Sequence, residues 1–182
     1  MFEITYFQMV IFITAAWIFV RLVAAAVNKT FSVKRELLLL LVYVCLIVLA
    51  RFVYFPLHLI EGKIGTLTIG LEPGFAEHIH VKPFYFITDA YDGQIINVIG
   101  NFTMFIPVGI VWPVCFKKLD NVFKALLACF GLSLFIELSQ LLCYDRHTDI
   151  DDLILNTSGA LFGILIVFII RKIKSSRKKE TD

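Results

Sequence analysis

The sequence has few charged residues and contains no familiar catalytic motif. Of its 182 residues, 18% are charged and 59% are hydrophobic, compared with roughly 45–50% apolar residues in soluble domains. Such a small charged fraction cannot cover a soluble core of this composition, so we expect an integral membrane protein. A Gly-rich phosphate loop and a nucleophile elbow are absent. Basic and aromatic residues do not alternate along any segment, which argues against a nucleic-acid partner.

The cysteines and histidines do not show the spacing of a disulfide framework or a metal site. Each cysteine falls within or at the end of an apolar run, as expected for thiols that face the core or the lipid. His78 and His80 follow Glu77 but lack a third well-spaced ligand. We therefore expect no metal at these residues and no cofactor. The four cysteines are Cys45, Cys115, Cys129 and Cys143.

Long apolar runs dominate the rest of the chain. A helix needs about 20 mostly apolar residues to cross a bilayer. Five segments meet this requirement: 5–27, 37–55, 95–116, 122–143 and 153–170. We expect one all-α domain over residues 1–182, a bundle of five transmembrane helices with a long loop over 56–94 and a basic tail over 171–182. The first segment lacks the basic start and small-residue cleavage site of a signal peptide.

The distribution of lysine and arginine predicts an orientation. These residues are concentrated between the first two spans, between spans three and four, and in the tail over 171–182. If the chain crosses the membrane five times, all three places lie on one side, which the positive-inside rule makes cytoplasmic. We therefore expect the N-terminus and the loop over 56–94 outside. Within this loop, 63–71 predicts a short hairpin, and the aromatic segment 84–87 is expected at the headgroup level.

Polar side chains in three of the spans are costly in lipid. Asn97 and Asn101 are four residues apart and share a helix face. They form either a helix–helix contact, worth about 0.6 kcal/mol in membranes, or the lining of a polar site. Glu137 and Gln140 are three residues apart in the fourth span, and an ionisable residue there suggests a functional site. Arg51 lies at a similar predicted depth, so we expect a Glu137–Arg51 ion pair.

An acid-rich segment precedes the fifth span. Asp149, Asp151 and Asp152 lie within four residues, with Arg146 before them and Asn156 one turn later. One or two acids would cap the helix and complement its dipole. Three closely spaced carboxylates repel each other unless a cation or protonation relieves them. Arg146, a divalent metal or a cationic substrate group would each provide such relief.

Two further features concern the helices themselves. Gly159 and Gly163 have the Gly-x-x-x-Gly spacing that permits close helix packing. Arg21, near the end of the first span, is expected to extend its guanidinium to the cytoplasmic interface, and we assign it no function.

The motifs in the second half of the chain, taken together, resemble the VanZ-like family. The similarity implies a multi-pass protein of the bacterial plasma membrane and an association with low-level resistance to the lipoglycopeptide teicoplanin. It does not imply a catalytic residue. It covers roughly 81–170, half of the chain. The matching elements are Asn101–Gly109, Glu137–Gln140, Arg146, Asp149, Asp151, Asp152, Asn156 and Gly159, with Val81–Phe84 ahead of them.

Two functions remain open on this basis. The first is a non-enzymatic protein that binds an extracytoplasmic amphiphile, such as a lipoglycopeptide or a lipid-linked wall precursor, beside membrane lipid. The alternative is a membrane enzyme in which the three aspartates hold a metal and Glu137 acts as acid or base. A clear nucleophile is lacking, which favours the first function. The oligomeric state stays open. The candidate ligand-binding residues are Arg51, Asn97, Asn101, Glu137, Gln140, Arg146, Asp149, Asp151, Asp152 and Asn156.

Overall fold

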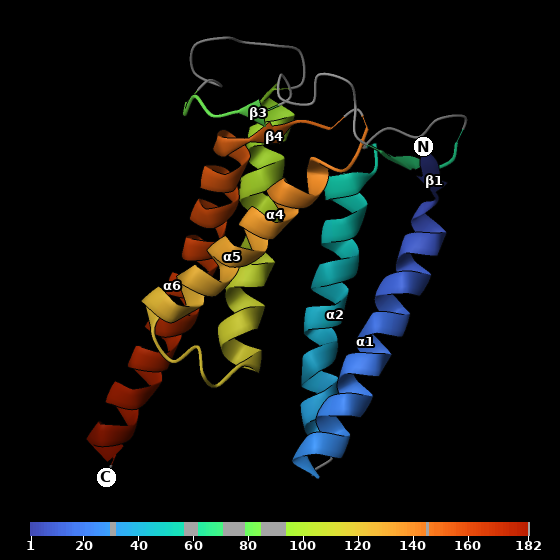
Figure 1. Cartoon of the computed structure of the whole chain (residues 1–182). Helices are drawn as coiled ribbons and strands as arrows, with labels where there is room; N and C mark the ends of the chain where they lie inside the picture. The colour runs from blue at the N-terminus through green and yellow to red at the C-terminus, as the bar shows by residue number, and fades with distance from the viewer. Residues whose placement is uncertain (30–31, 57–61, 71–78, 85–93, 145, 182) are drawn as a thin grey trace. The chain divides into compact units, whose positions relative to one another are not determined.

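The computed structural model describes residues 1–29, 32–56, 62–70, 79–84, 94–144 and 146–181, which are mostly helical (Figure 1). Five of the described helices are long and apolar enough to cross a membrane, which confirms the five predicted segments. Their orientation across the membrane stays a prediction. The helices are α1 (Tyr6–Asn28), α2 (Val33–Tyr54), α4 (Gln94–Cys115), α5 (Val122–Gln140) and α6 (Ile150–Thr181).

The boundaries of the last two helices differ from those predicted. Helix α5 ends at Gln140, three residues before the expected end of its span, and the chain turns there. Helix α6 begins at Ile150, because Asp149 already caps it, and it continues through the basic tail to Thr181. The tail is therefore a helical extension of the fifth span over its described residues.

The chain forms two compact units, which are described separately. The N-terminal unit comprises Met1–Ala76 and Ser139–Arg146, and the C-terminal unit comprises Glu77–Leu138 and His147–Asp182. Helix α5 thus contributes its last two residues to the N-terminal unit. The single domain expected from the sequence stays a prediction.

In the N-terminal unit, a small sheet joins the start of the chain to the loop after α2. Strand β1 (Phe2–Ile4) pairs antiparallel with β2 (Leu67–Ile69). The hairpin predicted within 63–71 is therefore wrong for the described residues 63–70. The alternating pattern does produce a strand, but its partner is the chain start rather than a second strand nearby. Such distant pairing has no local sequence signal.

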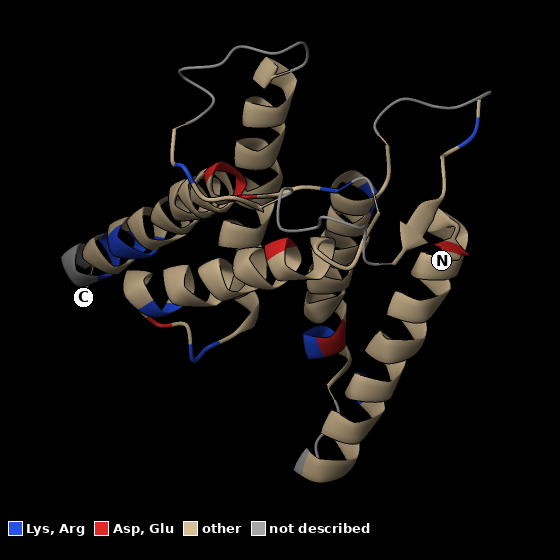
Figure 2. Ribbon diagram, turned by 45° about the horizontal axis from the view of Figure 1, so that its top comes forward, with Lys and Arg blue, Asp and Glu red and all other residues tan. Residues whose placement is uncertain are grey.

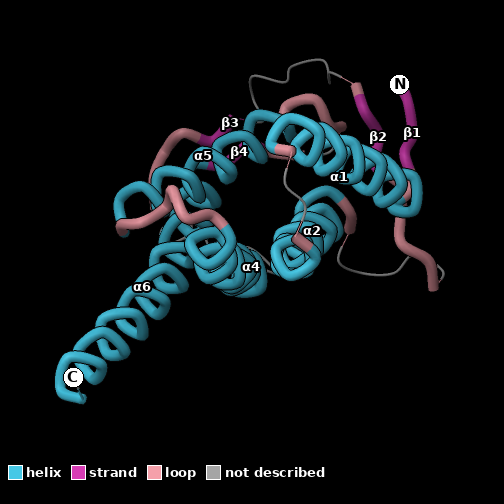
Figure 3. The backbone as a smooth tube through the Cα atoms, turned by 90° about the horizontal axis from the view of Figure 1, so that it is seen from below, coloured by secondary structure: helices cyan, strands magenta, loops and turns pink. Residues whose placement is uncertain are grey.

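Helices α1 and α2 of this unit lie side by side (Figure 3). A capping box formed by Thr5 and Gln8 begins α1. Further along, Arg21 donates two hydrogen bonds, of 2.8 and 2.6 Å, to the carboxylate of Glu36 on α2. This partner was not predicted from the sequence. The ion pair explains how a charged guanidinium is accommodated within an apolar helix pair.

In the C-terminal unit, α4 and α6 lie side by side (Figures 1 and 3). Glycines make this approach possible. A Cβ added at Gly159 or Gly163 would overlap with the backbone carbonyl oxygen of Phe102 or Ile106 on α4. A Cβ at Gly109 would overlap in the same way with the carbonyl of Ala160. The close packing predicted from the glycine spacing is confirmed, and Gly109 adds a third glycine to this α4–α6 seam.

A sheet of two strands, each two residues long, joins the described part of the loop before α4 to the segment directly before α6. Strand β3 (Ile79–His80) pairs in parallel with β4 (Thr148–Asp149). Of the aromatic segment expected at the headgroup level, only Phe84 is described, and 85–87 lie outside the described residues. Phe84 has a positive φ of 63°, which is uncommon for a residue other than glycine.

Candidate functional site

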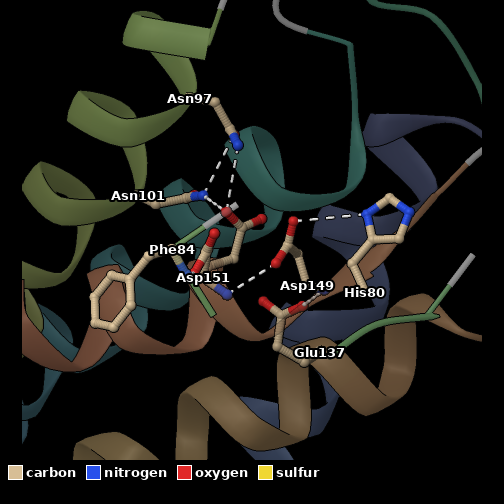
Figure 4. A network of polar contacts seen from close by, with 8 residues as sticks. His80, Phe84, Asn97, Asn101, Glu137, Asp149 and Asp151 are labelled. Carbon is tan, nitrogen blue, oxygen red and sulfur yellow. Dashed lines mark hydrogen bonds and ion pairs between the residues drawn. The ribbon is translucent and has the colours of Figure 1, made fainter. Parts of the chain in front are cut away.

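The asparagines of α4 converge on the first turn of α6 (Figure 4). The side-chain amides of Asn97 and Asn101 both donate to Oδ1 of Asp152, and Asn101 also donates to Asn97 at 3.3 Å. The four-residue spacing places both amides on the α4 face that meets α6. The predicted shared face is present, and its partner is a carboxylate. Bonds to a charged acceptor are stronger than bonds between neutral groups.

Glu137 on α5 contacts the segment that leads into α6. Its side chain is 3% exposed, and Oε2 accepts a hydrogen bond of 3.2 Å from the backbone N–H of Asp149. The backbone carbonyl of Glu137 accepts a second bond, of 2.8 Å, from the hydroxyl of Thr148. These two bonds connect α5 to strand β4 directly before α6.

The aspartates at the start of α6 have different surroundings. Asp149 caps the helix, because its Oδ1 accepts from the N–H of Asp151 at 2.8 Å. Asp151 is buried and accepts from the N–H of Phe84 at 2.6 Å. Asp152 is the acid that faces the asparagines. The capping role accounts for Asp149, and the bond to Phe84 draws Asp151 toward the loop before α4.

Two histidines lie beside this segment. Nδ1 of His80 is 3.7 Å from Oδ2 of Asp149, an ion pair when the histidine is protonated. The rings of His80 and His147 stack with centroids 5.7 Å apart. From the sequence, His80 was considered only as a candidate metal ligand with His78, which lies outside the described residues. The pairing of β3 with β4 brings His80 to Asp149, and the local sequence does not reveal that pairing.

A second polar contact between α5 and α6 lies one helical turn away from Glu137 and Asp152. The amide nitrogen of Asn156, four residues after Asp152, donates to the hydroxyl of Ser133 at 3.1 Å. Both side chains are buried, at 2% and 0% exposure. No donor among the described residues reaches Oδ1 of Asn156. Ser133 was not predicted as a site residue, although its position four residues before Glu137 places it on the same face of α5 as Glu137.

Three of the predicted site residues belong to the N-terminal unit. Arg51 donates to the carbonyl oxygens of Phe55 and Pro56, at 3.4 and 2.9 Å. Gln140 donates to the carbonyl of Val53 at 3.3 Å, and Arg146 lies in the segment that follows α5. The Glu137–Arg51 ion pair would join the two units and stays a prediction.

Charges are unevenly distributed along the C-terminal unit (Figure 2). Acidic residues occupy the beginning of α6, whereas Arg171, Lys172 and Lys174 lie near its other end. Among the described residues, no group of three or more His, Cys, Asp or Glu side chains is arranged to hold a metal ion. The metal-dependent alternative gains no support from this arrangement.

The fold defines a multi-pass membrane protein with a polar network between apolar helices. The model of the VanZ/LLP1 family matches residues 37–171, about three quarters of the chain, so the protein belongs to this family. The similarity to VanZ-like proteins that the motifs indicated is thereby confirmed. The matched range runs from α2 into α6 and includes every candidate site residue. No curated protein and no solved structure matches the chain.

Proposed function

We propose that this protein binds the polar headgroup of an extracytoplasmic amphiphile at the network between α4, α5 and α6. The candidate ligands are a lipoglycopeptide such as teicoplanin and a lipid-linked cell-wall precursor. Binding would contribute to low-level glycopeptide resistance or to envelope homeostasis in the bacterial plasma membrane. The observation that carries the proposal is the convergence of Asn97 and Asn101 on Asp152 at one end of an apolar helix pair.

The exposure of α4 supports an amphiphilic ligand. Asn97 is exposed, and on the same helix Ile95, Ile96 and Ile99 are 73%, 63% and 56% exposed. In a membrane such apolar side chains face acyl chains. Exposed apolar side chains and an exposed amide in the same turn of α4 would give an amphiphile both an apolar and a polar contact.

The positions of two acids, the buried Glu137 and the half-buried Asp152, support binding over a purely structural role. Helix packing in the C-terminal unit is already provided by the glycine seam, and Asp149 alone caps α6. The carboxylates of Glu137 and Asp152 neither cap α6 nor belong to the glycine seam. Ionisable groups within membrane helices are costly and usually functional.

The proposal is tested with Asp152→Ala in a teicoplanin-susceptible bacterium that expresses the chain. We expect wild-type protein to raise the inhibitory concentration and Asp152→Ala to remove this protection. The matched control is Asp120→Ala, which removes an exposed acid between α4 and α5 and should protect like the wild type. Immunoblots of membrane fractions establish that all three proteins are present in equal amounts. Full protection by Asp152→Ala would contradict the proposal.

A further inference from the structure

Each of the three described helices in the C-terminal unit contributes two polar residues four positions apart. We refer to these six side chains as the three-helix network. Each pair extends along one face of its helix over a single turn. The members are Asn97 and Asn101 on α4, Ser133 and Glu137 on α5, and Asp152 and Asn156 on α6.

The three amide nitrogens of the network are hydrogen-bonded, and one buried acceptor is not. The amides of Asn97 and Asn101 donate to Asp152, and the amide of Asn156 donates to Ser133. Oδ1 of Asn156, on a side chain only 2% exposed, receives no hydrogen bond from the described residues. Buried polar atoms are nearly always hydrogen-bonded in proteins. The unmatched group is thus an acceptor, and a ligand that completes the network must supply a donor.

The charge of the network also favours a ligand that supplies hydrogen-bond donors, and specifically a cationic one. Glu137 and Asp152 contribute two carboxylates, and Asp149 and Asp151 lie beside them. The basic side chains of α6 begin at Arg171, which is 19 residues after Asp152, or about 28 Å along a helix. At the acidic end, the described basic groups are Arg146, three residues before Asp149, the stacked His80 and His147, and the exposed Lys82, beside four carboxylates. Grouped carboxylates are stabilised by a nearby cation.

A divalent metal is a poor match for this arrangement. The described residues contain no group of three potential ligands at suitable positions, whereas Ca²⁺ needs six or more oxygen ligands close together. An ammonium group has N–H donors that point in several directions. It can therefore serve acceptors that are spread over two helices.

We infer that the three-helix network recognises a cationic nitrogen in the ligand's headgroup, with Glu137, Asp152 and Oδ1 of Asn156 as its acceptors. This inference rests on the proposed function and names the headgroup chemistry of its ligand. Asn97 and Asn101 act as positioning residues, because their amides hold the carboxylate of Asp152 in place.

The test compares chemically matched amphiphiles with the full chain in dodecyl maltoside micelles, whose headgroups are uncharged. Dodecylammonium and dodecanol share a tail and differ in charge, and butylammonium keeps the charge without the tail. Calorimetric titration at neutral pH, with empty micelles subtracted, gives the affinities. We expect dodecylammonium to bind at least tenfold more tightly than either of the other probes.

Variants locate the binding within the network. Asp152→Asn keeps the side-chain shape and removes the charge, and we expect it to weaken dodecylammonium binding at least tenfold. Glu137→Gln is the second variant and should also weaken dodecylammonium binding. It takes the place of Asp152→Asn in the test if Asp152→Asn does not fold. Asp120→Asn is the matched control and should bind like the wild type. Circular dichroism checks that each variant retains its helices.

The possible outcomes distinguish the recognition of a cationic headgroup from the binding of an amphiphile in general. Equal affinity for dodecylammonium and dodecanol, with both weakened by Asp152→Asn, would overturn the cationic headgroup and leave amphiphile binding intact. Butylammonium binding as tightly as dodecylammonium would support recognition of the cation and overturn the amphiphile as its source. Binding of no probe above empty micelles would overturn both proposals.

Discussion

Replacing Gly159 with alanine tests the packing on which the network depends. In α6, a Cβ at this position overlaps with the carbonyl oxygen of Phe102 on α4. The obstacle is backbone, so no side-chain rotation can relieve the overlap and the two helices must separate. Separation would loosen the contacts of Phe105 and Ile164, which are fully buried in the unit.

The expected cost follows from this geometry. An extra methyl group in a packed interior destabilises proteins by about 1–3 kcal/mol. Gly131 on α5 provides a matched control, since a Cβ there would meet nothing within 4 Å. Gly131→Ala should be neutral or stabilise by up to about 1 kcal/mol, because alanine favours a helix over glycine. We therefore expect Gly159→Ala to unfold more easily than Gly131→Ala by at least about 1 kcal/mol.

Equilibrium unfolding in mixed detergent micelles measures this difference. Increasing mole fractions of dodecyl sulfate are added to the protein in dodecyl maltoside, and helix content is followed by circular dichroism. Gly100→Ala is a second control within α4, again with no atom within 4 Å of the new Cβ. If all three variants unfolded at the same mole fraction, the close approach of α4 and α6 would be refuted.

Two further predictions concern charged pairs. Arg21→Ala and Glu36→Ala should each lower the free energy of unfolding by about 1 kcal/mol. The double variant should lose less than the sum of the two, because the two side chains share one interaction. Additive losses in the same titration would contradict this pairing. The hydrogen bond from Lys124 holds the pKa of Asp120 below its ordinary value of 3.8. The bond should therefore stabilise the protein fully above that value and lose its effect as the pH falls through the lowered pKa. Thermal scans of wild type and Asp120→Asn should converge in acid, and a difference that grows there would exclude the pairing.

Features encoded by neighbouring residues could be predicted from the sequence. Hydropathy alone located five helices, since crossing a bilayer imposes a length and an apolar composition on each segment. The four-residue spacing of Asn97 and Asn101 predicted one shared face, and their bonds to Asp152 use that face. The four-residue spacing of Gly159 and Gly163 likewise places both glycines on one helix face, which predicted a close helix contact.

Features that join distant segments could not be predicted in the same way. The pairing of Arg21 with Glu36 depends on the register of α1 against α2, which apolar sequence leaves open. Strand β2 pairs with Phe2–Ile4 rather than with its neighbours, because a strand can use any edge that the fold brings to it. Likewise, Ser133 resembled an ordinary small residue of a membrane helix until the partner helix placed Asn156 beside it.

The glycine seam and the three-helix network are structurally coupled. Phe102, whose carbonyl meets Gly159, directly follows Asn101, whose amide holds Asp152. Any change that moves α6 away from Phe102 therefore also pulls Asp152 away from Asn101. A hydrogen bond weakens steeply once its atoms separate beyond about 3.5 Å, so a displacement of about 1 Å at the seam is enough to disturb the network. The small residues of α4 and α6 thus serve the site as well as the fold, because they set the distance at which the asparagines reach the acid.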